Sequence, residues 1–140
     1  GLSYTDTAYG QDRLPDADLA LLPGSRTSFA PRWSGNLALS YEHAIGSQLI
    51  GRANLGAKYS SDYNVGTDLD PQKLQPSYTI VNARLGIGAS DKRWQLEAWA
   101  ENLGNVTYRQ VAIDAPLQAG SWNAFLGAPR TFGMTLRLRY

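Results

Sequence analysis

The chain has 140 residues, the size of one ordinary domain, with a net charge of +1, no cysteine and a single histidine, His43. The absence of cysteine excludes disulfide frameworks, thiol nucleophiles and thiolate metal sites, and one histidine excludes a multi-histidine metal site. So small a net charge excludes an electrostatic grip on nucleic acid. No apolar run reaches the ~18 residues of a membrane-spanning helix. A membrane-spanning strand is apolar on one face only, so a transmembrane barrel stays compatible with this composition.

Apolar residues recur at every second position along most of the chain, which is the period of a strand. The strictest alternation is in 131–140, where Phe132, Met134 and Leu136 share one face. The same period predicts further strands over 2–9, 32–42, 51–60, 81–88 and 94–101. A short segment, 16–22, fits a brief helix or a loop equally well. We therefore expect an all-β fold, an antiparallel up-and-down meander of about six strands.

The connections between these strands differ in length in a regular order. Tight turns at 44–48 and 89–92 alternate with long connections at about 10–27, 62–77 and 109–129. In an antiparallel meander this order places all long connections at one end of the sheet. Outer-membrane barrels combine short periplasmic turns with long extracellular loops. The order predicts that the meander is part of a transmembrane β-barrel whose three long loops are extracellular.

The polar face of the strands would meet the barrel interior if the apolar face meets lipid. Its charged residues, the candidates for facing the lumen, are Arg32, Arg52, Lys58, Arg84, Glu97, Glu101, Arg137 and Arg139. Wide barrels use such a face to line a channel or to hold a plug. The basic excess suggests contact with acidic plug residues or with an anionic solute, and an ordinary ion-paired wall is the alternative.

Catalytic and metal chemistry find little support in the sequence. His43 has no cluster of partners, and a strand would hold the carboxylates of Glu97 and Glu101 about 13 Å apart, too far for a glycosidase pair. Asp68 and Asp70 offer loop carboxylates for calcium but lack the ligand spacing of a calcium loop. We expect no catalytic residues, no cofactor and no bound metal, and therefore no enzyme.

Two C-terminal motifs make the chain resemble the barrel domain of TonB-dependent outer-membrane receptors. One is Asn-Leu-x-Asn-x-x-Tyr at the end of a strand, and the other is Gly-x-Pro-Arg before the last strand: Asn102, Leu103, Asn105, Tyr108, Gly127, Pro129 and Arg130. The family more often has Asp where Asn105 stands. The strands PRWSGNLALSYEH and SYTIVNARLGIG also resemble those of the family, so the resemblance covers about 28–140.

The last strand also resembles the signal that the outer-membrane assembly machinery recognises. The residues in question are Thr131, Gly133, Leu136, Leu138 and Tyr140. An exposed terminal strand of this kind can pair edge-on with a receiving strand.

The resemblance implies that 1–140 is the C-terminal segment of a receptor barrel from a Gram-negative outer membrane, without its plug and earlier strands. It also implies active uptake of a scarce solute, such as siderophore-bound iron, a vitamin or an oligosaccharide. The implied partners are outer-membrane lipid, the TonB complex through the absent N-terminal part, the assembly machinery and the solute. Two alternatives stay open, a fragment of another porin-like barrel and a soluble all-β module of a sugar-binding kind. Trp122 and Phe125 in the last loop either stack on a solute or pack the loop.

Overall fold

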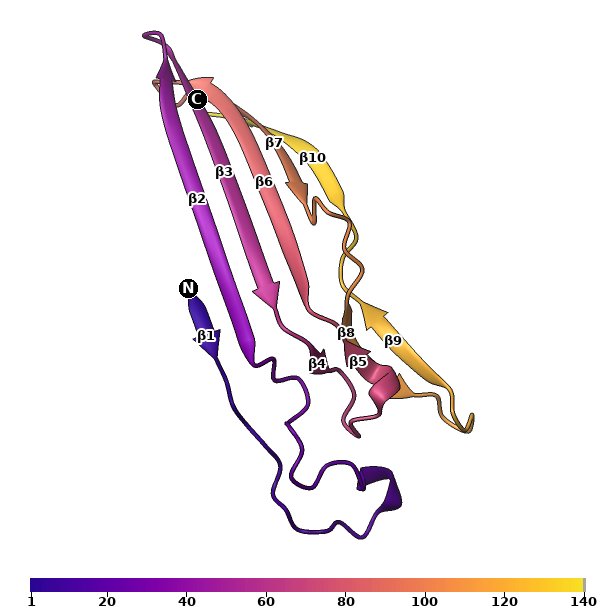
Figure 1. Ribbon diagram of the computed structural model, residues 1–140. Helices are drawn as coiled ribbons and strands as arrows, with labels where there is room; N and C mark the ends of the chain where they lie inside the picture. Colours follow the sequence, from indigo (N-terminus) through magenta and orange to yellow (C-terminus); the bar gives the residue numbers. More distant parts are fainter. Residues whose placement is uncertain (140) are drawn as a thin grey trace. The chain divides into compact units, whose positions relative to one another are not determined.

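The computed structural model describes residues 1–139, and of Asp18 only the backbone (Figure 1). Tyr140, the last residue of the expected assembly signal, lies outside the described residues. The chain divides into two compact units. The sheet unit comprises Asn36–Lys58, Thr79–Val106 and Ala128–Tyr140, and the loop unit comprises Gly1–Gly35, Tyr59–Tyr78 and Thr107–Gly127.

Six strands form the principal sheet and follow one another in chain order. They are β1 (Leu2–Tyr4), β2 (Trp33–Ile45), β3 (Leu49–Ser60), β6 (Tyr78–Ala89), β7 (Trp94–Glu101) and β10 (Thr131–Leu138). The sheet is an antiparallel meander, which confirms the predicted fold class. Among the described residues β1 and β10 each have one partner, so the sheet is open at both edges and does not close into a barrel.

The central strands are long enough to cross the apolar band of an outer membrane. β2, β3 and β6 contain 13, 12 and 12 residues. At ~3.3 Å per residue and a tilt of ~40°, such strands rise roughly 30 Å. β2 continues into β3 through residues 46–48 and β6 into β7 through 90–93, whereas 5–32, 61–77 and 102–130 are long connections.

Strand register sorts the side chains of the sheet unit onto two faces. Since successive side chains alternate and neighbouring strands pair in step, residues of one parity line up across the strands. The apolar face carries three rows, Ala83–Ala100–Phe132, Leu85–Ala98–Met134 and Ile87–Leu96–Leu136. The polar face carries the rows Arg84–Trp99–Gly133, Gly86–Glu97–Thr135 and Gly88–Gln95–Arg137.

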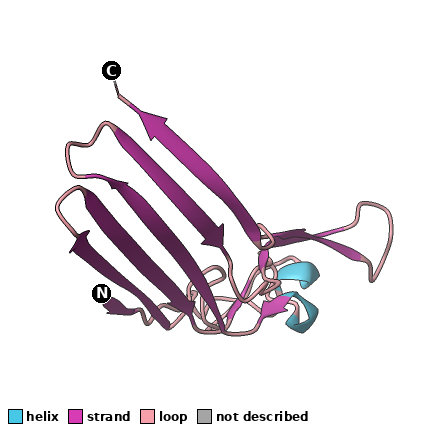
Figure 2. Ribbon diagram, turned by 90° about the horizontal axis from the view of Figure 1, so that it is seen from above, coloured by secondary structure: helices cyan, strands magenta, loops and turns pink. Residues whose placement is uncertain are grey.

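The apolar face of the sheet unit is uncovered in this chain. Figure 2 shows the long strands side by side in one layer. Leu85, Met134 and Phe132 expose 64%, 69% and 79% of their surface. The buried hydrophobic residues of the described chain, Leu22, Val65 and Ala112, all belong to the loop unit. A soluble β-sandwich covers such a face with a second sheet, so this arrangement disfavours the soluble module.

The loop unit contains two small ribbons that the sequence did not predict. One pairs β4 (Tyr63–Asn64) with β5 (Leu74–Gln75), and the other pairs β8 (Arg109–Asp114) with β9 (Trp122–Leu126). Two 3₁₀ turns, η1 (Ala17–Leu19) and η2 (Pro71–Lys73), are the helical elements of the described residues. The segment 16–22 is therefore a single turn within a loop. None of the helical segments described is long and apolar enough to span a bilayer.

Candidate functional site: the polar face, the motif residues and the loop unit

Arg84 connects the two glutamates that β7 contributes to the polar face. It lies opposite Trp99, so Glu97 and Glu101 are its two diagonal neighbours on β7. Its guanidinium nitrogens lie 3.7 Å from an oxygen of Glu97 and 3.8 Å from one of Glu101. One cation thus bridges two carboxylates that the sequence left separate. Exposed pairs of this kind contribute about 0–1 kcal/mol, so the contact organises the face more than it stabilises it.

The other expected lumen-facing residues divide into paired and unpaired groups. Arg52 Nε donates to Glu42 Oε2 across β2 and β3 at 2.7 Å. Lys58 is exposed in β3, and Arg32 is exposed just before β2 begins. Arg137 and Arg139 have no carboxylate within ion-pair distance among residues 1–139. The structure therefore places most of these residues on one face without giving them one common site.

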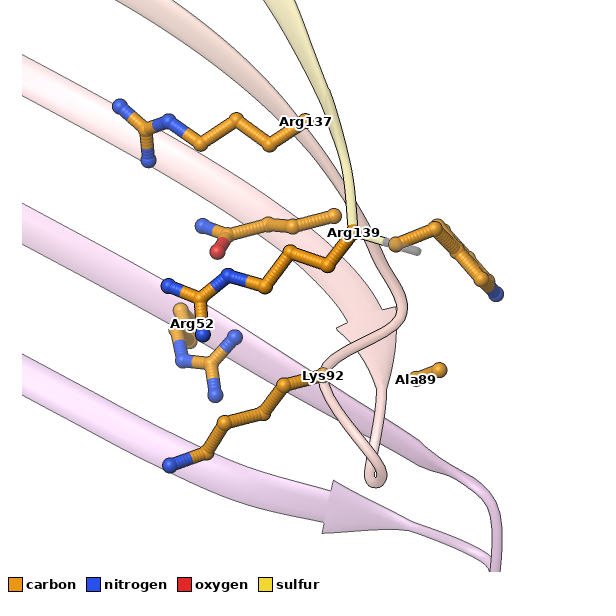
Figure 3. A pocket seen from close by; sticks show the side chains of 7 residues that line it. Arg52, Ala89, Lys92, Arg137 and Arg139 are labelled. Atoms are coloured by element: carbon orange, nitrogen blue, oxygen red, sulfur yellow. The ribbon is translucent and has the colours of Figure 1, made fainter.

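Cations gather where β10 ends beside the turn 90–93. Arg52, Lys92, Arg137 and Arg139 line one cavity of about 270 Å³, the basic pocket, together with Gln95 and neighbouring residues. Figure 3 shows the four cationic side chains on the same side of the sheet. The backbone N–H of Arg139 donates to the carbonyl of Arg93 at 2.8 Å, which extends the ladder beyond β10 and fixes the direction of this side chain.

Asn102, the first residue of the Asn-Leu motif, ties the end of β7 to the chain before β10. Its side chain is buried, with 3% exposed. Nδ2 donates to the carbonyls of Val106 and Ala128 at 2.9 and 3.0 Å, and Oδ1 accepts from the N–H of Val106 at 2.9 Å. Its φ of +50° lies in the left-handed region, which asparagine tolerates better than most residues. These three hydrogen bonds use both the N–H donors and the carbonyl acceptor of the Asn102 amide.

The remaining motif residues continue this link. The N–H of Leu103 donates to the carbonyl of Val81 at 2.8 Å. Asn105 Oδ1 accepts from the N–H of Arg130 at 3.1 Å, next to Pro129.

In the loop unit, the ring of Tyr108 lies where a Cβ on Gly127 would be, so glycine is required at that position. The Tyr108 ring also stacks on Tyr78 with centroids 4.7 Å apart. The motif residues thus connect separate backbone segments through hydrogen bonds and ring packing.

The expected assembly residues of β10 lie on the open edge of the sheet. Thr131 and Gly133 are on the polar face, and Leu136 and Leu138 are on the apolar face with 60% and 58% exposed. A Cβ on Gly133 would lie 2.6 Å from Cζ2 of Trp99, so this glycine makes room for the indole.

The loop unit is built around a buried lysine, Lys73, which the sequence analysis missed. Its Nζ lies 2.6 Å from Asp68 Oδ2 and 2.6 Å from Asp114 Oδ1, and its side chain is 1% exposed. Burial lowers the pKa of Lys73, but hydrogen bonds to Asp114 and Asp68 outweigh burial, so its pKa lies above the usual value. Burial raises the pKa of Asp68, but hydrogen bonds from Lys73 and from backbone N–H groups outweigh it, so this pKa is lowered.

These contacts give the acidic cluster of the loop unit a cation from the chain itself. Ligand oxygens of Asp68, Asp70 and Asp114 lie within 4.8 Å of one another. The ammonium of Lys73 already forms ion pairs with two of these carboxylates, and Asp70 caps η2 by accepting from the N–H of Gln72 at 2.8 Å. No continuous sequence motif could reveal the cluster, because Asp114 is 41 residues from Lys73.

Arg109 joins the second and third long connections. Its Nη1 donates to the carbonyls of Gln72 and Leu74 at 3.3 and 2.9 Å, and its guanidinium lies 4.9 Å from the ring centroid of Trp122. Trp122 Nε1 donates in turn to Gln72 Oε1 at 3.0 Å. Trp122 therefore packs the loops, as one of the two sequence interpretations has it, whereas Phe125 is 61% exposed.

Comparison with known families agrees with this architecture. The chain matches the family described as TonB dependent receptor-like, beta-barrel, over residues 1–103. Comparison with curated proteins finds no match, and comparison with solved structures finds none either. The matched region covers β1 through β7, and only the first two residues of the Asn-Leu motif fall within it. This chain belongs to the TonB-dependent receptor family and forms part of its β-barrel, a family of outer-membrane receptors and transporters rather than enzymes.

Proposed function

We propose that this chain forms part of the wall of a barrel in a Gram-negative outer membrane, in a receptor that imports a scarce solute by active transport. The observation that carries the proposal is the uncovered apolar face, on which Leu85, Met134 and Phe132 are 64% to 79% exposed. In water such a face would favour aggregation, whereas in a bilayer it meets acyl chains. Family membership supports the same location.

The polar face lines the barrel interior in this proposal. Its ion pairs, Arg84 with Glu97 and Arg52 with Glu42, keep charged groups compensated on a wall that contacts water or a plug. Charged residues on the lipid side would cost about 2–4 kcal/mol each near the bilayer centre. A barrel wall therefore requires its charged residues to lie on one face, as they do in this sheet.

The loop unit supplies part of the solute-recognition surface, with 10–27, 62–77 and 109–129 as extracellular loops. The exposed side chains of Val111, Ile113 and Phe125 on the β8–β9 ribbon offer apolar contact. The connections through Lys73 and Arg109 hold this ribbon against the preceding loop, which reduces the ordering cost of binding. Siderophore-bound iron, a vitamin and an oligosaccharide are the solute classes that we propose.

Two protein partners complete the proposal. The TonB complex would drive transport through the N-terminal part of the receptor. The assembly machinery would receive β10 by edge pairing, since its outer edge has no partner among the described residues.

Single cysteines along β10 test the orientation of the wall, because this chain has no native cysteine. In membranes containing the intact receptor, cysteines at Met134 and Leu136 should react with lipid-soluble maleimides. Cysteines at Thr135 and Arg137 should react with water-soluble reagents instead. Equal labelling of all four positions by the water-soluble reagent would contradict the proposal.

Uptake is tested with a strain that lacks the receptor gene. We expect this strain to lose uptake of one of three labelled probes, a ferric siderophore, cobalamin or a maltodextrin. In the parent strain, a protonophore should abolish uptake of the same probe. If the deletion strain takes up all three probes as fast as the parent strain, these solute classes are refuted.

A further inference from the structure

The basic pocket carries more positive charge than its surroundings neutralise. Arg52 is paired with Glu42 at 2.7 Å, and the nearby carboxylate of Asp91 is taken by Arg93 at 3.2 Å. Lys92, Arg137 and Arg139 have no carboxylate within 4.0 Å among the described residues. Three cations therefore line one cavity without a counter-charge from the described residues.

The arrangement of these cations is set by the backbone. Arg137 and Arg139 are two residues apart along an extended segment, so their side chains leave the same face roughly 6.6 Å apart. Arg52 comes from β3, on the far side of β6 and β7 from β10, and its side chain lines the same cavity. Like charges held this close repel one another, and a bound anion would relieve that repulsion.

The chemistry of the lining favours a compact anion of high charge. Guanidinium groups present planar pairs of N–H donors that match the oxygens of a phosphate. A single carboxylate cannot satisfy several guanidinium and ammonium groups at once, whereas a phosphate or diphosphate has the charge and the number of oxygens to do so. The cavity of about 270 Å³ fits such a group better than a folded segment.

We propose that the basic pocket is a binding site for a phosphate or diphosphate group. The group belongs either to a soluble phosphorylated compound or to a lipid headgroup. Binding requires only the residues of the sheet unit, and the pocket lies on its polar face beside the turn 90–93.

Calorimetry on the intact receptor in a neutral detergent tests this site. We expect inorganic pyrophosphate to bind at low salt, and the variants Arg137→Gln and Arg139→Gln to bind it at least about tenfold more weakly. Lys58→Gln is the matched control, because it removes one exposed cation from β3 outside the pocket and should leave binding unchanged. Both arginines are exposed, so the variants should fold, which circular dichroism would verify.

A second titration with short-chain phosphatidate distinguishes the two sources of the group. Binding of pyrophosphate alone would assign a soluble ligand, and tighter, arginine-dependent binding of phosphatidate would assign a lipid headgroup. The proposal is wrong if neither probe binds, or if both bind the arginine variants as tightly as the unaltered receptor. Binding of a polyglutamate peptide in place of both phosphate probes would assign the pocket to an acidic protein segment and also overturn it. Solute uptake is measured separately, so failure here leaves the proposed transport function intact.

Discussion

Replacing Leu55 by arginine tests whether the apolar face of the sheet contacts lipid or water. Leu55 lies in the middle of β3 (Leu49–Ser60) and is 46% exposed in this chain. Asn54 precedes it, is also exposed, and lies on the opposite, polar face. The two substitutions Leu55→Arg and Asn54→Arg introduce the same side chain one residue apart, so their difference reports the environment of each face.

The expected magnitude follows from the exposure of Leu55. Because nearly half of this side chain is already uncovered, its replacement in water would change the free energy of unfolding by only about 0.5 kcal/mol. At the centre of a bilayer, arginine on the lipid face costs about 2–4 kcal/mol. That cost corresponds to roughly a 30- to 700-fold change in the folding equilibrium. Asn54→Arg faces water in both cases and should stay within about 0.5 kcal/mol.

The assay is urea unfolding of the intact receptor in lipid vesicles, followed by tryptophan fluorescence. Unaltered receptor and both variants are measured under one set of conditions, with equal slopes against urea as a check on comparability. Free energies of unfolding that differ by less than about 0.5 kcal/mol between Leu55→Arg and Asn54→Arg would refute the assignment of the apolar face to lipid.

Three further substitutions and one pH dependence test the contacts of Lys73, Gly127 and Asn102. Lys73→Met should leave the partly buried Asp68 without its cation and destabilise the loop unit by about 1–3 kcal/mol, measured by hydrogen exchange of 61–77. The pKa of Asp68 is lowered and that of Lys73 is raised, so the stabilisation from their ion pair should persist from about pH 4 to pH 10. This stabilisation should be lost below that range, where Asp68 becomes protonated, and above it, where Lys73 becomes deprotonated. Gly127→Ala should displace the ring of Tyr108 at a cost of about 1–3 kcal/mol, measured as a lower thermal midpoint. Asn102→Gly keeps the positive φ but removes the side-chain hydrogen bonds, and should cost about 1–3 kcal/mol in the same assay.

Each of the three substitutions has a comparison variant. Lys58→Met removes an exposed lysine and should leave exchange of 61–77 unchanged. Tyr108→Ala combined with Gly127→Ala should cost less than the sum of the two single changes, because the clash requires both groups. Asn102→Asp should be as damaging as Asn102→Gly, since a carboxylate oxygen would face the carbonyl of Ala128. Full stability of Asn102→Gly would contradict the linking role.

The period of the sequence was sufficient for five strands of the principal sheet, whereas the predicted strand 2–9 extends well beyond β1 (Leu2–Tyr4). The predicted ranges 81–88 and 94–101 lie within or coincide with β6 (Tyr78–Ala89) and β7 (Trp94–Glu101). The prediction succeeded because side-chain alternation is a local property of an extended chain. It failed for the β4–β5 and β8–β9 ribbons, whose short, loop-like sequences carry no clear alternation.

Sequence alone thus determined that this protein is an antiparallel meander with one apolar and one polar face, and which charged residues share the polar face. The tertiary structure determined which of these charged residues contact one another. Arg84 reaches both Glu97 and Glu101 because register sets Trp99 opposite it. Lys73 finds Asp114 only because the two long connections fold against each other. Such contacts depend on strand register and on loop closure between distant segments, which residue type and local spacing do not specify.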